Sequence, residues 1–238
     1  MISELVKDLF INFVIFIIGI LFAKLYNLIW WRIPIRKFWK IENDSQVYIV
    51  TTSTPENIRI DDNEFMSLGY TIQYLALGKV ELILKKIYPN INMIIRMDCY
   101  FERYYYDQNL ILFGGPIGND CTNEFLKRLN PPFKFNGYTL IDTRTNEKFQ
   151  SVIHNEKIIE DYTLVIKAKN PLDSKKTIII IAGCRAPGSL IGALFLSEIN
   201  IKTFKKLSCD KNLALVLKGD VLDYAKVSNI KIVKQYNF

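Results

Sequence analysis

Apolar positions along the chain follow three patterns, and each pattern predicts a different kind of element. An almost continuous apolar run covers residues 9–31, long enough to cross the roughly 30 Å hydrocarbon core of a bilayer. Apolar residues three and four apart over 64–87 indicate a helix with one buried face. Short apolar runs at 109–115 and 177–182 indicate strands covered on both faces. The chain therefore predicts a membrane span followed by an α/β domain.

The region after the span alternates strands with helices. Strands are expected at 47–52, 91–97, 109–115, 161–169, 177–182, 213–217 and 230–233, and helices at 64–87, 120–129 and 190–199. Residues 138–153 predict an antiparallel hairpin that turns near Thr145 and Asn146. We therefore predict an α/β fold: a Rossmann-like, mixed and mostly parallel sheet with an antiparallel hairpin insertion, preceded by one N-terminal transmembrane helix. Residues 1–40 would form the anchor with a basic juxtamembrane segment, and 41–238 the domain.

The apolar run favours an uncleaved anchor over a signal peptide. A signal peptide would begin with a basic segment and end at a cleavage site made of small residues. Here the run ends in the bulky pair Trp30 and Trp31, which suits an aromatic belt at the membrane interface. Lys24 can extend its amine toward the headgroups. Residues 9–31 are therefore expected to contact membrane lipid.

Basic residues flank this span unequally. Lys7 precedes it, whereas four basic residues follow closely: Arg32, Arg36, Lys37 and Lys40. The positive-inside rule then predicts a single-pass protein of the cell membrane with its C-terminal domain in the cytoplasm. Pro34 is expected to end the helix near Ile33, and the basic-aromatic stretch 35–41 to rest on the anionic leaflet.

The distribution of charge argues against a nucleic-acid partner. The net charge is +7, of which +4 falls in residues 1–40 and only +3 in the remainder. The predicted domain has a local basic cluster, Lys202, Lys205, Lys206 and Lys211. A nucleic-acid-binding domain would present a broader basic face. Nucleic acid is therefore not an expected partner.

The cysteines are too dispersed for a disulfide framework or a metal site. Cys99, Cys121, Cys184 and Cys209 form no C-x-x-C pair, and the chain has a single histidine, His154. We expect reduced thiols, no metal and no cofactor. A thiolate activated by a helix N-terminus at Cys121 or Cys184 is the alternative, because both lie near glycine-rich turns.

Two of these turns follow apolar strands and precede helices. The first holds Gly114, Gly115 and Pro116, with Asn119 as the N-cap of the next helix. The second runs from Gly183 to Ser189 and contributes Arg185, Gly188 and Ser189. Glycines allow a ligand to approach the backbone, and a helix N-terminus attracts an anion. We expect the two turns to meet and bind an anionic small molecule, although they could also serve only to turn the chain.

Neither turn matches a motif that specifies a ligand. The phosphate loop G-x-x-x-x-G-K-[ST] and the dinucleotide fingerprint G-x-G-x-x-G are both absent. Glu124, in the helix after the first turn, is a weak candidate for a catalytic carboxylate of glycoside-type chemistry. The run Tyr100, Tyr104, Tyr105 and Tyr106 predicts either an aromatic wall over the site or a packing cluster at the sheet edge.

The order of these motifs resembles a group of prokaryotic Rossmann-like domains to which no activity is assigned. The shared features are the Gly-Gly-Pro-x-x-Asn turn at 114–119, Asp161-Tyr162 with Asn170-Pro171, and the Ala-Gly-x-x-x-x-Gly-Ser turn at 182–189. In that group the last motif usually ends in Gly-Thr. More distantly, the first turn is similar to nucleotide-sensing Rossmann domains of the SLOG and nucleoside deoxyribosyltransferase type in bacterial defence systems. The resemblance to the first group covers roughly 47–200, and the similarity to the more distant families implies recognition or cleavage of nucleoside derivatives.

These observations predict a membrane-anchored cytoplasmic Rossmann-like domain that binds a nucleotide-like or other anionic small molecule. A role as a sensor or effector in signalling or defence would follow. The alternatives are an N-glycosidase-type enzyme that cleaves nucleosides or NAD, and a membrane-tethered interaction module without a ligand. An anchor helix can associate with a second copy, so a homo-oligomer stays open.

Overall fold

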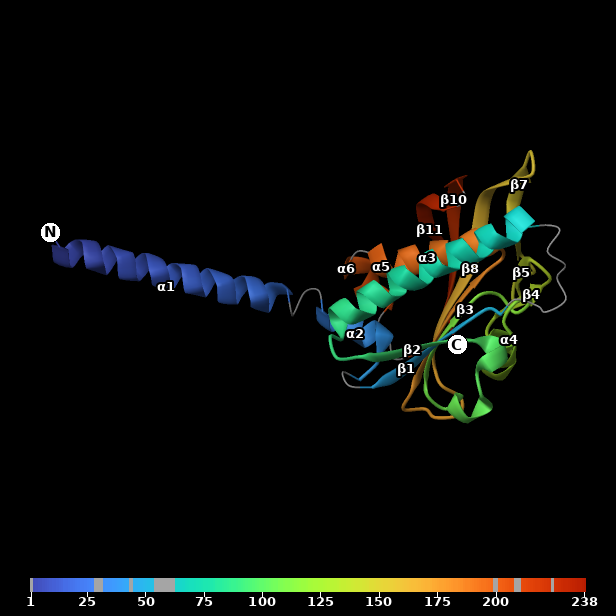
Figure 1. The fold of residues 1–238 in the computed structure, drawn as a ribbon, viewed down its shortest axis with the longest axis horizontal. Coiled ribbons are helices and arrows are strands. Elements are labelled where there is room, and N and C mark those ends of the chain that lie inside the picture. The colour runs from blue at the N-terminus through green and yellow to red at the C-terminus, as the bar shows by residue number, and fades with distance from the viewer. Residues whose placement is uncertain are drawn as a thin grey trace.

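The computed structural model describes residues 2–27, 32–42, 45–53, 63–198, 201–207, 211–223 and 225–238 (Figure 1). Three residues considered above lie outside the described residues: Trp30, Trp31 and Cys209. In the described part, a long N-terminal helix precedes a domain in which helices cover both faces of a sheet.

Helix α1 (Ile2–Asn27) is apolar enough to span a membrane. Its stretch Leu9–Tyr26 has a mean hydropathy of 2.3, and none of that stretch is buried against the rest of the chain. Side chains such as Phe22, at 72% exposure, therefore find no cover within the described part of the chain. Figure 1 shows α1 extending away from the domain. A bilayer would supply the cover that the protein lacks.

Helix α2 (Ile33–Trp39) belongs to the folded domain rather than to a membrane surface. Pro34 does not end a helix here but lies in the first turn of α2, where its missing N–H costs nothing. Phe38 and Trp39 are fully buried in the main core, so these two rings of the stretch expected on the leaflet pack inside the domain instead. The buried side chains of α2 thus pack with the domain that was expected to begin at residue 41.

The main sheet has the strand order β11-β10-β8-β9-β3-β1-β2, with β7 paired to β8. One half is parallel and consists of β2 (Asn92–Met97), β1 (Gln46–Thr51), β3 (Asn109–Phe113) and β9 (Thr177–Gly183). The other half is antiparallel and consists of β7 (Val152–His154), β8 (Lys157–Lys169), β10 (Leu213–Asp223) and β11 (Lys226–Asn237).

The sheet is mixed, as expected, but it is not mostly parallel. Its described strands make three parallel and four antiparallel pairings. The reason is β8, which runs along β9 in the opposite direction from Thr163 to Lys169, so that β10 and β11 extend the antiparallel half.

A second, three-stranded sheet contains β4 (Phe133–Asn136), β5 (Thr139–Asp142) and β6 (Lys148–Phe149). The predicted hairpin is present as β5 and β6, and Asn146 adopts a positive φ of 58° between them. The end of the predicted segment joins the main sheet instead, because β7 turns into β8 through Asn155 and Glu156, both at positive φ. Strand β4 was not predicted.

Helices divide between the two faces of the main sheet. One core contains residues of α2, α3 (Asn63–Ile87), α5 (Ala186–Glu198) and α6 (Ile201–Leu207). The opposite core contains residues of α4 (Asp120–Leu129), the small sheet and the aromatic segment around the short helices η3 (Asp98–Tyr100) and η4 (Arg103–Tyr105). Successive residues of a strand point to opposite faces, so Ile111 packs in the first core and Leu112 in the second.

The parallel strands all end along one border of the sheet, which we call the carboxyl edge, and all begin along the opposite border, which we call the amino edge. Helices α3 and α4 follow β1 and β3 onto opposite faces, so a switch in strand connection lies at the carboxyl ends of these two strands. Ligands of open α/β sheets bind at such positions. Helix α2 lies at the amino edge, because the Thr177 hydroxyl, at the start of β9, donates to the carbonyl of Lys40 at 3.1 Å.

Candidate functional site

The two glycine-rich turns meet at the carboxyl edge of the sheet. Strands β3 and β9 are neighbours, and the Gly114 N–H donates to the carbonyl of Ile181 at 3.0 Å. A Cβ added at Gly115 would lie 3.0 Å from the carbonyl oxygen of Gly183. The turns that the sequence predicted to form one site are therefore adjacent in space.

The loop after β1 packs directly against Gly114 in the first turn. Gly114 has a φ of 96°, which favours glycine, and a Cβ there would collide with the side chain of Thr52. The Thr52 hydroxyl donates to the side-chain oxygen of Gln73 on α3. Gly114 thus lets two segments pack closely, and this packing fills the space that a ligand would need at that glycine.

Asn119 is the N-cap of α4, as predicted, and it also joins β1 to β3. Its Oδ1 accepts from the Thr122 N–H at 2.8 Å. Its Nδ2 donates to the carbonyls of Phe113 at 2.8 Å and Val50 at 3.3 Å. The side chain is fully buried with both amide hydrogens engaged, so it positions the turn rather than facing a ligand.

Asp98, which the sequence analysis did not single out, occupies the N-terminus of α4. Its Oδ2 accepts from the Asp120 N–H at 2.9 Å, and its Oδ1 accepts from the Ser53 N–H at 2.7 Å. The carboxylate therefore sits where an anionic ligand was expected. The available signal was an acidic residue directly after the predicted strand 91–97.

The second turn has an equivalent internal carboxylate, that of Asp161 on β8. Its Oδ2 accepts from the Gly188 N–H at 2.6 Å, and its Oδ1 accepts from the Ser151 hydroxyl at 2.7 Å and the Tyr162 N–H at 2.8 Å. Burial raises the pKa of Asp161 to about 6, and the hydrogen bonds only partly oppose that shift. The start of α5 is therefore also occupied by a carboxylate.

Gly183 and Gly188 are packed against each other. A Cβ added at Gly188 would lie 2.7 Å from the Cα of Gly183, and one at Gly183 would collide with the backbone of Arg185 and Ser189. Ser189 is buried as well. Helix α5 starts at Ala186, earlier than the predicted residue 190, because Pro187 is acceptable in a first helical turn. These residues hold α5 tightly on the sheet.

Arg185 is the charged side chain of the second turn, and it points toward the small sheet. Its guanidinium carbon lies 4.6 Å from the ring centroid of Tyr138, between β4 and β5. Both residues are at least partly exposed. Arg185 therefore has a cation–π partner and reaches the surface where the turns and the small sheet approach one another.

A pocket of about 410 Å³ lies between α4 and β4 and begins at Pro116. Its lining residues are Pro116, Asn123, Leu126, Lys127, Asn130, Pro131, Phe133, Lys134 and Phe135. They include two lysines, two amides and aromatic surface, and none of them is acidic. This volume falls within the usual range of small-molecule sites. Among the predicted site residues, only Pro116 contributes to the wall.

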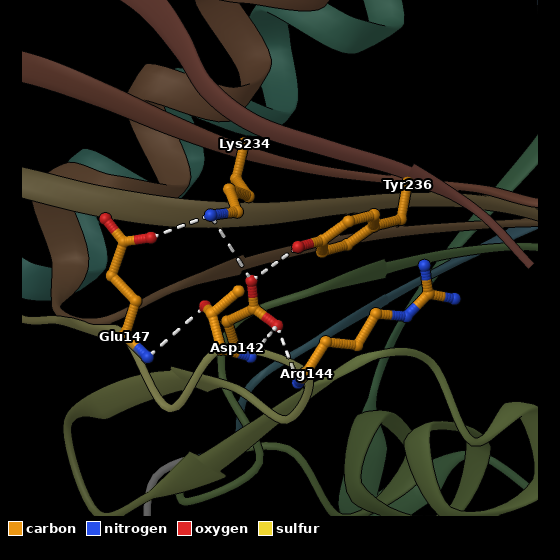
Figure 2. Close-up of polar contacts among 6 residues, drawn as sticks. Asp142, Arg144, Glu147, Lys234 and Tyr236 are labelled. Atoms are coloured by element: carbon orange, nitrogen blue, oxygen red, sulfur yellow. Dashed lines mark hydrogen bonds and ion pairs between the residues drawn. The ribbon is translucent and has the colours of Figure 1, made fainter.

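The buried carboxylate of Asp142 fixes the small sheet against β11 (Figure 2). It accepts hydrogen bonds from the Arg144 N–H and the Tyr236 hydroxyl, both at 2.8 Å, and lies 3.7 Å from the Lys234 amine. Burial by itself would raise the pKa of Asp142, but these hydrogen bonds outweigh it and hold the pKa below its ordinary value. Lys234 also contacts Glu147 at 2.9 Å.

Glu124 on α4 forms ion pairs with two arginines and does not face the pocket beside Pro116. Its Oε1 accepts from Arg128 Nη2 at 2.6 Å and Nε at 3.1 Å, and its other oxygen lies 4.0 Å from Arg103 on η4. Glu124 is not among the residues that line the pocket beside Pro116. The contacts therefore direct this carboxylate toward η4.

The tyrosine run divides between packing and exposure. Tyr105 and Tyr106 join an aromatic cluster, in which the ring centroid of Tyr105 lies 4.7 Å from that of Tyr48 and the ring centroid of Tyr106 lies 5.6 Å from that of Phe101. Tyr104 is 81% exposed, and Tyr100 is exposed as well. The packing interpretation thus applies to the second half of the run.

The cysteines near the turns are buried thiols. Burial raises the pKa of both Cys121 and Cys184 to about 12. Neither has the acidified thiol that nucleophilic catalysis requires. Among the described residues, no three His, Cys, Asp or Glu side chains gather as metal ligands would.

The described geometry places three features side by side at one edge: two meeting turns, internal carboxylates at both helix starts, and a basic-aromatic pocket beginning at Pro116. The sequence did not indicate the two pocket lysines as site residues. Lys134 lies on strand β4, which was not predicted, and Lys127 follows an ordinary helix pattern. No protein-family model and no curated protein sequence matches this chain.

Proposed function

We propose that this chain is a membrane-anchored, Rossmann-like domain that binds a nucleotide-like or other anionic small molecule. The binding place is the pocket between α4 and β4, beside the turn that contains Pro116. The domain would face the cytoplasm and act as a sensor or effector, with α1 as its anchor.

The observation that carries this proposal is the chemistry of the pocket wall. Lys127 and Lys134 supply two positive charges without a lining carboxylate to neutralise them. Asn123 and Asn130 offer amides for directional hydrogen bonds, and Phe135 offers an aromatic surface. A phosphorylated ligand with a flat heterocycle matches that combination.

The glycine turns support the site indirectly in this proposal. Because Asp98 and Asp161 already occupy the two helix starts, a ligand phosphate is better placed beside the pocket lysines than at either helix terminus. Arg185 provides a further positive charge near the small sheet. Gly114 and Asn119 then fix the position of Pro116 at the rim.

The positive-inside rule supports the cytoplasmic orientation, because the basic residues follow the apolar helix rather than precede it. The strand order supports the Rossmann-like assignment: β2-β1-β3-β9 places the connection switch between β1 and β3, where such domains bind ligands. The contacts of Glu124 with Arg103 and Arg128 give no support to the enzymatic alternative.

The proposal is tested by titrating the full chain, in nanodiscs of neutral lipid, with ATP, adenosine and inorganic phosphate. ATP is expected to raise the thermal midpoint more than adenosine does, because the lysines contact the phosphates. Lys127→Ala with Lys134→Ala should weaken ATP binding by roughly tenfold per lysine. The matched control is Lys148→Ala with Lys157→Ala, which removes the same charge from exposed positions outside the pocket.

Two outcomes would contradict the proposal. If none of the three probes shifts the midpoint, the chain is better described as an interaction module. If ATP binds equally well to the pocket variant and the control variant, the ligand lies elsewhere. Cleavage of a nucleoside or NAD by the full chain would favour the enzyme instead.

A further inference from the structure

Helices α2 and α6 carry basic residues without acidic ones. Residues 32–41 and 201–207 together contain seven basic residues and no Asp or Glu: Arg32, Arg36, Lys37, Lys40, Lys202, Lys205 and Lys206. The five lysines are exposed, and the two arginines are half-buried. We refer to these seven residues as the α2–α6 basic surface. More than 160 residues of sequence separate its two halves, so the chain order alone does not reveal it.

The apolar sides of the two helices bring the basic sides together. The rings of Phe38 on α2 and Phe204 on α6 meet edge to face, with centroids 5.3 Å apart, and both are buried. Figure 1 shows α6 close to α2, at the end of the domain from which α1 leaves. The lysines of both helices thus lie at the amino edge of the sheet, opposite the turns.

A pocket of about 410 Å³ opens on this surface, and its lining is mainly basic. It is formed by Ile33, Arg36, Lys37 and Lys40. Arg36 is held in the wall, because its Nη2 donates to the carbonyl of Ile87 at 2.9 Å and its guanidinium lies over the ring of Tyr88 at 5.4 Å. Fixing Arg36 in this way lowers the entropic cost of binding an anion.

We propose that the α2–α6 basic surface binds the anionic phospholipid headgroups of the membrane that α1 enters, with a headgroup phosphate in the pocket of Arg36, Lys37 and Lys40. This inference rests on the proposal that α1 is a membrane anchor, but not on the pocket beside Pro116. Lysine-rich segments close to a bilayer are attracted to anionic lipids by about fivefold in affinity per residue.

The position of the α2–α6 basic surface favours a lipid over another anionic partner. Arg32 follows the apolar helix within a few residues, so a chain anchored through α1 holds α2 at headgroup level. Glu42 follows Lys40 by two residues, and Glu198, at the end of α5, lies 3.9 Å from Lys79 on α3 and is thus partly neutralised. A leaflet is also broad enough to contact α2 and α6 at once.

The lipid contact would orient the domain. With α2 and α6 both on the leaflet, the amino edge of the sheet faces the membrane and the carboxyl edge faces the cytosol. The Lys202, Lys205 and Lys206 cluster then serves as a second attachment point, which limits rotation of the domain about α1.

The test compares hydrogen exchange of the full chain in two kinds of nanodisc. One contains only phosphatidylcholine, and the other contains about a third phosphatidylglycerol. Peptides covering 32–41 and 201–207 are expected to exchange several-fold more slowly on the anionic membrane, and 0.5 M NaCl should remove the difference, since the Debye length falls to about 4 Å. A variant with Lys37→Glu, Lys40→Glu, Lys202→Glu and Lys206→Glu should show no slowing.

The control variant, Lys148→Glu with Lys157→Glu, should behave like the wild type, because those lysines lie on the small sheet and at the β7–β8 turn. Equal exchange on both membranes would overturn the proposal, and so would slowing that survives in the fourfold variant. Soluble glycerol phosphate is added to neutral nanodiscs as a further arm, and slowing there would assign the pocket to a free anion instead. ATP binding, measured in neutral nanodiscs, is independent of all these outcomes.

Discussion

The hydroxyl of Tyr236 donates a 2.8 Å hydrogen bond to the carboxylate of Asp142, 94 residues earlier in the chain. Asp142 ends β5 of the small sheet, and Tyr236 lies near the end of β11 in the main sheet. The Tyr236 ring also packs on Phe133, with centroids 5.4 Å apart. This pair therefore attaches the sheet that forms one wall of the pocket.

Tyr236→Phe should lower the unfolding free energy by about 1–2 kcal/mol, because the buried Asp142 loses one donor but keeps the others. Asp142→Ala should cost more, about 3 kcal/mol, because it leaves the Lys234 amine and two backbone N–H groups without their shared acceptor. Denaturant unfolding of the full chain in detergent measures both. Tyr104→Phe, at an 81% exposed position, is the control and should change stability by less than about 0.5 kcal/mol.

Asp161 predicts an unusual dependence of stability on pH. Its pKa is about 6 in the folded protein against an ordinary 3.8, so the folded state binds this proton more tightly than the unfolded state. The stabilising contribution is then complete below about pH 4 and is lost as the pH rises through 6, an effect on the order of 3 kcal/mol. Asp161→Asn should gain stability relative to the wild type over that interval.

Unfolding free energies at pH 4, 5, 6 and 7 test this directly. Asp107→Asn serves as the control, since Asp107 is exposed and should leave the wild-type profile unchanged. Parallel profiles for the wild type and Asp161→Asn would show that Asp161 has no such role.

The close packing of α5 on the sheet can be tested with glycine substitutions. Gly188→Ala places a Cβ 2.7 Å from Gly183 Cα and 3.0 Å from Asp161 Oδ2, so it should destabilise the protein by about 1–3 kcal/mol. At Gly78 in α3, no described atom beyond the adjacent backbone of the helix lies within 4 Å of an added Cβ, so Gly78→Ala should stabilise by up to about 1 kcal/mol. In thermal unfolding, Gly188→Ala should lower the midpoint temperature and Gly78→Ala should raise it. An unchanged midpoint for Gly188→Ala would contradict the close packing.

The burial of α2 sets where a soluble fragment must begin. A fragment of residues 32–238 keeps Phe38 and Trp39, both at 0% exposure, whereas 41–238 loses them. Removing either side chain from a core costs about 3–5 kcal/mol. We expect the longer fragment to unfold cooperatively and the shorter one to aggregate or melt far lower. Within the full chain, Trp39→Ala should be destabilising and Lys37→Ala close to neutral.

Local signals explain which elements were predicted well. The helix 120–129 has its predicted bounds and cap because Asn119, an acidic first turn and a basic last turn are all encoded within one short segment. The strands at 91–97 and 177–182 were also close to the observed β2 and β9. Contiguous apolar runs are sufficient to place such strands.

Long-range pairing explains the rest. The antiparallel pairing of β8 with β9 was readable in principle, because the short 170–176 connection leaves no room for the crossover that a parallel pair needs. The site contacts were not readable, because Asp98 and Asp161 reach helix starts that lie 22 and 27 residues away in the sequence. The sequence predicted that the turns would meet, but not that carboxylates would already occupy their helix termini.

The placement of α2 at one edge of the sheet and Pro116 at the other separates two electrostatic environments. The seven residues of β9 cover roughly 23 Å between those edges, at about 3.3 Å per residue. That is nearly three times the roughly 8 Å Debye length of a physiological salt solution. Headgroup composition should therefore leave nucleotide affinity unaltered, and a solute would reach Lys127 and Lys134 by diffusion through bulk water rather than along the bilayer.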